Sequence, residues 1–258
     1  MPIDFHAQEN RKTYATRSAD PAWREMVEKL ADLRGKTAVD LGCGGGIYSR
    51  ELVELGASSV VGVDFSASNL AGAKENCADL PMIQFQQGDA YATGLPAQTV
   101  DFVLERALIH HLDSLPRNFK EVHRILRSDG LLLVQDRTME DVLQPPSPTH
   151  LRGYFFAQFP KLVDVEKKRR VADTAVREAL QNAGFAQIFS RTFWEVRRSY
   201  AHRDEFVQDV RGRYGRSLLH ELNDQEIDQL TQQLTQTIPP DIELTETDRW
   251  TIWIARKP

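Results

Sequence analysis

Short apolar runs rich in β-branched residues alternate with amphipathic stretches along most of the chain. This alternation is typical of a parallel sheet whose two faces are covered by helices. Helices are predicted over 46–55, 66–76, 114–126 and 171–182. Strands are predicted over 37–41, 59–64, 82–86, 99–104, 131–135, 188–191 and 249–255. The pattern therefore predicts an α/β fold with a seven-stranded sheet.

Residues at the ends of these segments support the predicted boundaries. Gly56 follows the first helix, at a position where positive φ costs glycine little. Ser66 is a suitable N-cap for the second helix. Residues 128–130, with the sequence Ser-Asp-Gly, predict a turn before the fifth strand.

Two segments interrupt the alternating pattern. Residues 137–170 are rich in proline and then in aromatic side chains, and residues 197–246 contain apolar residues at helical spacing. We expect a single domain, residues 1–258, in which both segments are inserted and form a helical cap. Residues 1–20 are either a lid over a ligand or a disordered or simply packed terminus. The core is predicted to comprise approximately residues 21–136, 171–196 and 247–258.

The composition narrows the class of protein. With 41% hydrophobic and 27% charged residues, the 258-residue chain can form a sizeable core. Its net charge of -5 argues against a general nucleic-acid binder. No apolar run reaches membrane-spanning length and the first residues do not resemble a signal peptide, so a cytoplasmic location without membrane contact is expected. Cys43 and Cys77 lack metal-type spacing, which predicts reduced thiols and no metal site.

A glycine-rich turn follows the first predicted strand, directly behind Asp40. It contains Gly42, Gly44 and Gly46, and glycine allows the backbone to turn at positive φ and to approach a ligand closely. A helix that begins here offers free N–H groups to electronegative ligand atoms. A dinucleotide fingerprint would need glycine where the chain has Ile47, so a nicotinamide cofactor is disfavoured. A plain tight turn is the alternative.

Two further acidic residues stand at the ends of predicted strands. Asp64 ends the second strand, where a carboxylate can accept hydrogen bonds from ribose hydroxyls, although it can instead cap the next helix. Asp89 follows the third strand, where it can bind an adenine amino group while the Ala90 N–H donates to the ring; a Gly-Asp turn is the alternative. Cys43 is either a small side chain beside a ligand or a nucleophile. Asp40, Asp64 and Asp89 together are more specific than any one of them.

The segments VDLGCGGGIYS, VVGVDFS, FQQGDA, TGLPAQTVDFVLERALIHHL, FKEVHRILRSDGLLLVQD and LQNAGF occur in this order. In this order they resemble the class I S-adenosylmethionine-dependent methyltransferases, and most closely the branch of ubiquinone and menaquinone biosynthesis. The resemblance covers roughly residues 35–192 and the final strand. It implies a Rossmann-like fold with a mostly parallel sheet and an antiparallel last strand. It also implies S-adenosyl-L-methionine as the cofactor and S-adenosyl-L-homocysteine as the product.

The resemblance further assigns roles to residues of the predicted site. Glu105, after the fourth strand, is placed near the sulfonium and the methyl acceptor. The remaining positions form the cofactor site: Asp40 and the loop with Gly42, Cys43, Gly44 and Gly46 at the methionine part, Asp64 at the ribose, Phe65 at the adenine face, and Asp89 with Ala90 at the adenine edge.

Methyl transfer from a sulfonium is an in-line displacement that depends on alignment more than on covalent chemistry. A hydroxyl, thiol or enol acceptor must also lose a proton, and histidine is the usual base near neutral pH. His110 and His111 follow the fourth strand and are candidates for this role. Glu105 is a third candidate, or a polar group facing the sulfonium. The histidine pair can instead simply support its loop.

The acceptor site is expected in the two inserted segments. They carry a basic run at 166–170 and six arginines between 197 and 216, which fit an anionic substrate, RNA or a solvated helix face. Aromatic residues at 154–159 either line a pocket for a planar acceptor or form a core. The predicted function is methyl transfer from S-adenosylmethionine to a small molecule, anionic or aromatic. The alternatives are cofactor binding without catalysis, methylation of a macromolecule such as RNA, and, least favoured, an NAD-dependent oxidoreductase.

Overall fold

The structure is a computed structural model that describes residues 19–258. These residues form two compact units. We call residues 19–136, 171–193 and 251–258 the sheet unit, and residues 137–170 and 194–250 the helical unit. Residues 1–18 of the lid predicted over approximately residues 1–20 lie outside the described residues.

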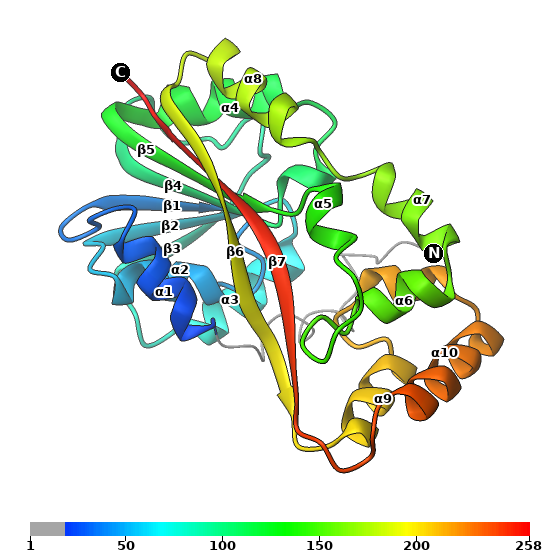
Figure 1. The fold of residues 1–258 in the computed structure, drawn as a ribbon. Helices are drawn as coiled ribbons and strands as arrows, with labels where there is room; N and C mark the ends of the chain where they lie inside the picture. Colours follow the sequence, from blue (N-terminus) through cyan, green and yellow to red (C-terminus); the bar gives the residue numbers. More distant parts are fainter. Residues whose placement is uncertain (1–18) are drawn as a thin grey trace. The chain divides into compact units, whose positions relative to one another are not determined.

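A seven-stranded sheet has the order β3-β2-β1-β4-β5-β7-β6 (Figure 1). Strands β1 to β5 pair in parallel, and β7 pairs with β5 in antiparallel orientation. The predicted Rossmann-like fold, mostly parallel with an antiparallel last strand, is therefore confirmed. The strands are β1 (Thr37–Leu41), β2 (Ser59–Asp64), β3 (Ile83–Gln87), β4 (Val100–Arg106), β5 (Leu126–Asp136), β6 (Ala186–Tyr200) and β7 (Leu244–Arg256).

Helices cover both faces of the sheet unit (Figure 1), because parallel strands require crossover connections. The adjacent residues Val103 and Leu104 of β4 are buried in two different apolar cores, as the alternation of side chains along a strand requires. One core contains side chains of α4 and α8, and the other contains side chains of α1 and α2. The helical elements of this unit are α1 (Pro21–Glu28), α2 (Ile47–Glu54), α3 (Ala67–Asn76), the 3-10 helix η2 (Ile109–His111), α4 (Leu115–Ile125) and α8 (Asp173–Asn182).

Three strands are longer than the sequence pattern predicts. β5 already begins at Leu126, and the turn predicted at 128–130 is an irregularity within this strand, where Asp129 has a φ of 63° and the pairing with β4 shifts register. β7 begins at Leu244, and its burial alternates up to Trp250 although the residues between these two are all polar, so the charged side chains of Glu246 and Asp248 are buried. β6 continues to Tyr200 through mostly exposed residues, which include Trp194 and Val196. A search for continuous apolar runs does not detect such strands.

The helical unit has its own apolar core. It contains the stacked rings of Phe155 and Phe206, whose centroids are 6.4 Å apart. Phe155 and Phe156 are both buried in this core, which favours the core interpretation of the aromatic residues at 154–159 over a pocket. The unit comprises α5 (Met139–Val142), α6 (Gly153–Gln158), α7 (Lys161–Lys167), α9 (Arg203–Arg211), the 3-10 helix η3 (Ser217–Glu221) and α10 (Asp224–Thr237).

Among the described helices, none combines the length and the apolar character that a membrane span requires.

Candidate cofactor-binding site

The predicted site residues of the sheet unit stand at the carboxyl ends of its parallel strands. Asp40 is the penultimate residue of β1, Asp64 is the last of β2, and Glu105 is the penultimate residue of β4. The register pairs Leu41 of β1 with Glu105. Asp89 follows the end of β3 by two residues. Ligands of open α/β sheets bind at this edge, so the fold brings the predicted residues to one place.

The loop between β1 and α2 requires glycine for two different reasons. Gly42, Gly44 and Gly46 have φ values of 77°, 51° and 79°, in the left-handed region. A Cβ on Gly42 would lie 2.9 Å from Leu108, and a Cβ on Gly46 would lie 3.1 Å from Ala73. A Cβ on Gly44 would have no heavy atom within 4 Å. The loop is therefore packed at its ends and open at Gly44, which fits a cradle for the methionine part of a cofactor.

We expect Gly46→Ala to lower the free energy of unfolding by about 2–4 kcal/mol, because left-handed backbone strain and overpacking add together. Gly35→Ala is the matched control: Gly35 has a φ of 71° but nothing within 4 Å of an added Cβ. The control variant should lose only the free energy of left-handed backbone strain, about 1–2 kcal/mol. Urea unfolding of the full chain measures both variants, and equal losses would show that packing around Gly46 contributes nothing.

Asp40 and Cys43 lie in the same buried environment. Asp40 is 2% exposed and accepts a hydrogen bond from Ser49 Oγ at 2.7 Å. Burial raises the pKa of Asp40 to about 6, although the Ser49 hydrogen bond opposes this shift. Burial, with the charges of Asp40 and Asp64, holds the pKa of Cys43 well above its ordinary value. The thiol is therefore protonated, which disfavours a nucleophile at this position.

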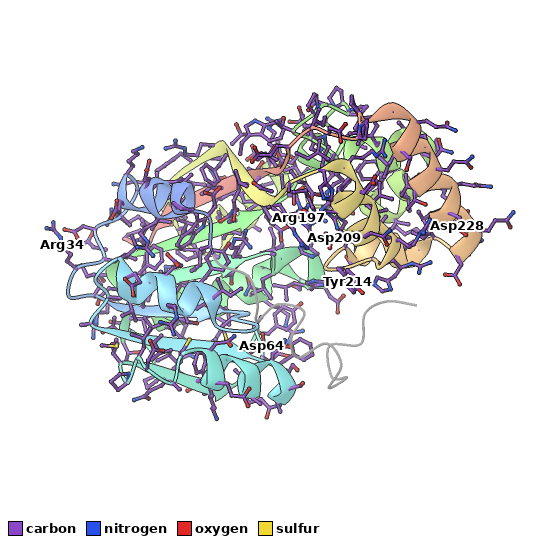
Figure 2. The ribbon with its side chains drawn as sticks, turned by 90° about the horizontal axis from the view of Figure 1, so that it is seen from below. Arg34, Asp64, Arg197, Asp209, Tyr214 and Asp228 are labelled. Atoms are coloured by element: carbon purple, nitrogen blue, oxygen red, sulfur yellow. The ribbon has the colours of Figure 1, made fainter. Side chains whose placement is uncertain are left out.

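Asp64 joins the glycine loop to the start of α3 (Figure 2). Its carboxylate accepts hydrogen bonds from the Gly44 N–H and the Ser66 N–H, each at 2.9 Å, and from Asn69 Nδ2 at 3.2 Å. The next side chain, Phe65, is 50% exposed. An exposed aromatic ring beside a buried carboxylate suits a nucleoside ligand. Its adenine base can stack on the ring while its ribose hydroxyls bind the carboxylate. The N-cap of α3 is Ser66, as predicted, and not Asp64.

The predicted adenine-edge residues lie in a turn that α4 holds in place. Asp89 Oδ1 accepts a hydrogen bond from the Tyr91 N–H at 2.7 Å, so Asp89 does form the turn that was the alternative interpretation. The Ala90 carbonyl accepts a hydrogen bond from Asn118 Nδ2 at 3.2 Å, and Thr93 donates to Glu121 through its N–H. These contacts fix the backbone of the turn.

Glu105 is fully buried beside Asn118. Its Oε1 accepts a hydrogen bond from Asn118 Nδ2 at 2.8 Å, while its Oε2 has no hydrogen-bond partner in the described part of the chain. Burial raises the pKa of Glu105 to about 7, and the nearby charge of Asp136 adds to this shift. At the carboxyl end of β4, Glu105 is therefore close to half protonated near neutral pH.

The two candidate histidines differ in their surroundings. Both belong to η2, and their ring centroids are 4.0 Å apart. His110 Nδ1 lies 2.8 Å from Asp136 Oδ2, and the side chain of His110 is only 10% exposed. His111 is exposed. Of the two, His110 has the oriented ring that a general base needs.

Sequence reasoning missed three polar partners of the candidate site: Ser49, Asn118 and Asp136. Asp136 carried a usable signal, because it directly follows the predicted fifth strand just as Asp64 ends the second. Ser49 and Asn118 lie inside helices, where the sequence pattern marks only apolar faces. Only the packing of those helices onto the sheet brings their side chains to Asp40 and Glu105.

The arginines of the two basic stretches, 166–170 and 197–216, are paired within the helical unit. All six arginines from Arg197 to Arg216 form ion pairs with acidic residues, and Asp209, labelled in Figure 2, binds two of them. Glu166 likewise binds Arg169 and Arg170. Internal acids thus account for these charges without an anionic substrate or RNA. Among residues 19–258, no group of His, Cys, Asp or Glu side chains is placed to hold a metal ion.

The sheet order, the antiparallel β7 and the glycine loop after β1 together define a class I methyltransferase fold. A family model described as a methyltransferase domain matches residues 39–134. Over 117 residues, the chain is 32% identical to the 2-phytyl-1,4-naphtoquinone methyltransferase of Thermosynechococcus vestitus. That match covers 44% of this chain and 52% of the relative.

Solved structures share the fold at low sequence identity. The phosphoethanolamine N-methyltransferase 2 of Haemonchus contortus, in complex with S-adenosyl-L-methionine, superposes with a TM-score of 0.64 at 17% identity, covering 99% of this chain and 60% of that chain. A SAM-dependent methyltransferase from Aquifex aeolicus gives 0.58 at 15% identity, covering 98% and 99%. The chain thus spans just over half the length of the naphtoquinone methyltransferase and three fifths of the Haemonchus contortus methyltransferase.

Residues 39–134 match the methyltransferase domain family, and the fold is that of the class I S-adenosylmethionine-dependent methyltransferases. This confirms the predicted family and, with it, the cofactor class of that family. The roles of the individual site residues remain predictions.

Proposed function

We propose that this protein transfers a methyl group from S-adenosyl-L-methionine to a small-molecule acceptor. The single observation that carries the proposal is the row of acidic groups, Asp40, Asp64 and Asp89, at the ends of β1 to β3 around the open glycine loop. The matched relatives support the same class of reaction, since their names describe methyltransferases.

In this proposal the cofactor supplies an electrophilic methyl carbon, and the chain supplies its orientation. The loop at Gly44 accommodates the methionine part, Asp64 binds the ribose hydroxyls, Phe65 stacks on adenine, and Asp89 with Ala90 binds the adenine edge. Glu105, near the end of β4, and His110, in η2 just after β4, lie on the side of the reacting groups. Methylation of RNA is less well supported, because the arginines of the helical unit already have acidic partners.

Binding of S-adenosylhomocysteine tests the cofactor assignment. We expect Asp64→Asn to weaken its binding about 10- to 100-fold, because hydrogen bonds to a charged group are each worth about 1.5–3 kcal/mol. Asp79→Asn, which removes an exposed carboxylate bound to Arg50, is the control and should bind normally. Calorimetry gives both affinities. A thermal shift with NAD but not with S-adenosylhomocysteine would overturn the proposal.

Turnover is a separate question from binding. Incubation with S-adenosylmethionine and a metabolite mixture, followed by mass spectrometry, should reveal S-adenosylhomocysteine and a product heavier by one methylene. Binding without any turnover would instead support a cofactor-binding protein that lacks a productive acceptor site.

A further inference from the structure

A buried carboxylate holds the ring of His110. Asp136 is the last residue of β5 and is 1% exposed. Its two carboxylate oxygens lie 3.0 and 2.8 Å from His110 Nδ1, and Oδ2 also accepts the His110 backbone N–H at 3.3 Å. Because β4 and β5 are neighbouring parallel strands, η2 just after β4 lies beside the end of β5. The pair is therefore fixed by the sheet.

This contact determines which ring nitrogen carries the proton. A carboxylate is an acceptor only, so Nδ1 must be the donor when the ring is neutral. Nε2 then keeps its lone pair and can accept a proton. A carboxylate that orients a histidine in this way is a known arrangement of general bases.

We propose that Asp136 is a positioning residue that fixes His110 as the Nδ1–H tautomer, so that His110 Nε2 removes a proton from the methyl acceptor. The inference rests on the proposed function and deepens it. It specifies an acceptor whose reacting group carries a dissociable proton, such as a phenol, a thiol or an enol. A tertiary amine or a thioether would have no proton for Nε2 to take.

For a hydroxyl acceptor, the proposed step moves a proton to His110 and a methyl group to the acceptor oxygen. The acceptor O–H bond breaks and its proton goes to His110 Nε2. The oxygen lone pair forms the new bond to the methyl carbon, while the carbon–sulfur bond breaks and leaves its electron pair on sulfur. The products are the methyl ether, S-adenosylhomocysteine and a protonated His110 beside the Asp136 carboxylate, and the proton is later released to water.

The tautomer can be measured without cofactor or substrate. Long-range proton–nitrogen correlation spectra of the full chain labelled with 15N-histidine, recorded at alkaline pH, distinguish a protonated ring nitrogen from an unprotonated one. The signal that disappears in His110→Gln identifies this ring among the seven histidines of the chain. We expect protonated Nδ1 and unprotonated Nε2 in the wild type. In Asp136→Ala and Asp136→Asn the population of the Nε2–H tautomer should rise.

Asp173→Asn is the matched control, because Asp173 accepts a ring N–H from Trp253 at 2.7 Å, within the same unit. This variant should lose stability but leave the His110 tautomer unchanged. An Nε2–H tautomer in the wild type, or an unchanged tautomer in both Asp136 variants, would overturn the inference.

Kinetics extend the test once an acceptor is found. Asp136→Asn should lower kcat by about 100- to 10,000-fold, the range for loss of general-base catalysis, with unchanged S-adenosylhomocysteine affinity. An unchanged kcat would overturn the role of Asp136. Failure of S-adenosylhomocysteine to bind, with the tautomer as expected, would instead refute the proposed function and leave the arrangement of Asp136 and His110 intact.

Discussion

Arg216→Met is expected to destabilise the helical unit by about 3–5 kcal/mol, which is the usual cost of removing one partner of a buried ion pair. The Arg216 side chain is fully buried and donates to Asp209 Oδ2 at 2.8 Å and to Glu246 Oε2 at 2.6 Å. Glu246 is fully buried as well, and the Arg216 guanidinium helps to hold its pKa below the ordinary value against burial. Methionine fills similar volume but leaves both carboxylates without this partner.

Arg198→Met provides the control for this prediction. Arg198 binds the same Asp209, at 2.8 Å, but its side chain is 55% exposed. Exposed ion pairs contribute only about 0–1 kcal/mol, so this variant should remain close to the wild type. Urea unfolding with hydrogen exchange of peptides from 194–250 measures the loss in the unit concerned. Equal, small losses in both variants would show that burial of the network adds no stability.

Glu105→Gln is expected to change how stability depends on pH. The folded-state pKa of Glu105 is raised to about 7 from 4.5, so the folded protein holds this proton more tightly than the unfolded chain. The resulting stabilisation is complete below pH 4.5 and is lost as pH rises toward 7. The wild type should therefore lose about 3 kcal/mol across this window through Glu105 alone, at about 1.4 kcal/mol per pKa unit.

Glutamine has no proton to lose, so the stability of Glu105→Gln relative to the wild type should increase between pH 5 and pH 8. Glu121→Gln is the control, because the pKa shift of Glu121 has the opposite sign. Hydrogen bonds from Arg124 and Thr93 lower the pKa of Glu121 to about 2. Its stabilising contribution is present above pH 4.5 and is lost as pH falls toward 2, so this control should show a constant deficit from pH 5 to 8. Urea unfolding at several pH values checks both. A pH-independent difference for Glu105→Gln would contradict the raised pKa.

Much of the candidate site follows from local sequence. Positive φ at Gly42, Gly44 and Gly46 is a local requirement of the loop. Asp64 can be predicted as a site residue because it ends a strand, before any packing is known. The site at the strand ends could be predicted because parallel strands direct all their carboxyl ends to one edge. The order of these segments was enough to identify the family, which the comparisons confirm.

Other features depend on contacts between distant residues. Asp136 and His110 are 26 positions apart, and no periodicity links them; only the β4–β5 register brings them together. The arginines from 197 to 216 look like a basic surface along the chain. Their partners include Glu246, which is remote in sequence, so only folding shows that the charge is neutralised.

The sequence by itself determined the sheet, the family resemblance and the glycine loop at the strand ends, because backbone conformation, strand alternation and helix caps are set by residues a few positions apart. The tertiary structure decided the protonation of Glu105, the orientation of His110 and the pairing of the buried arginines. Those properties depend on burial and on charges from distant segments, since desolvation and Coulomb interactions are fixed only when the chain has packed.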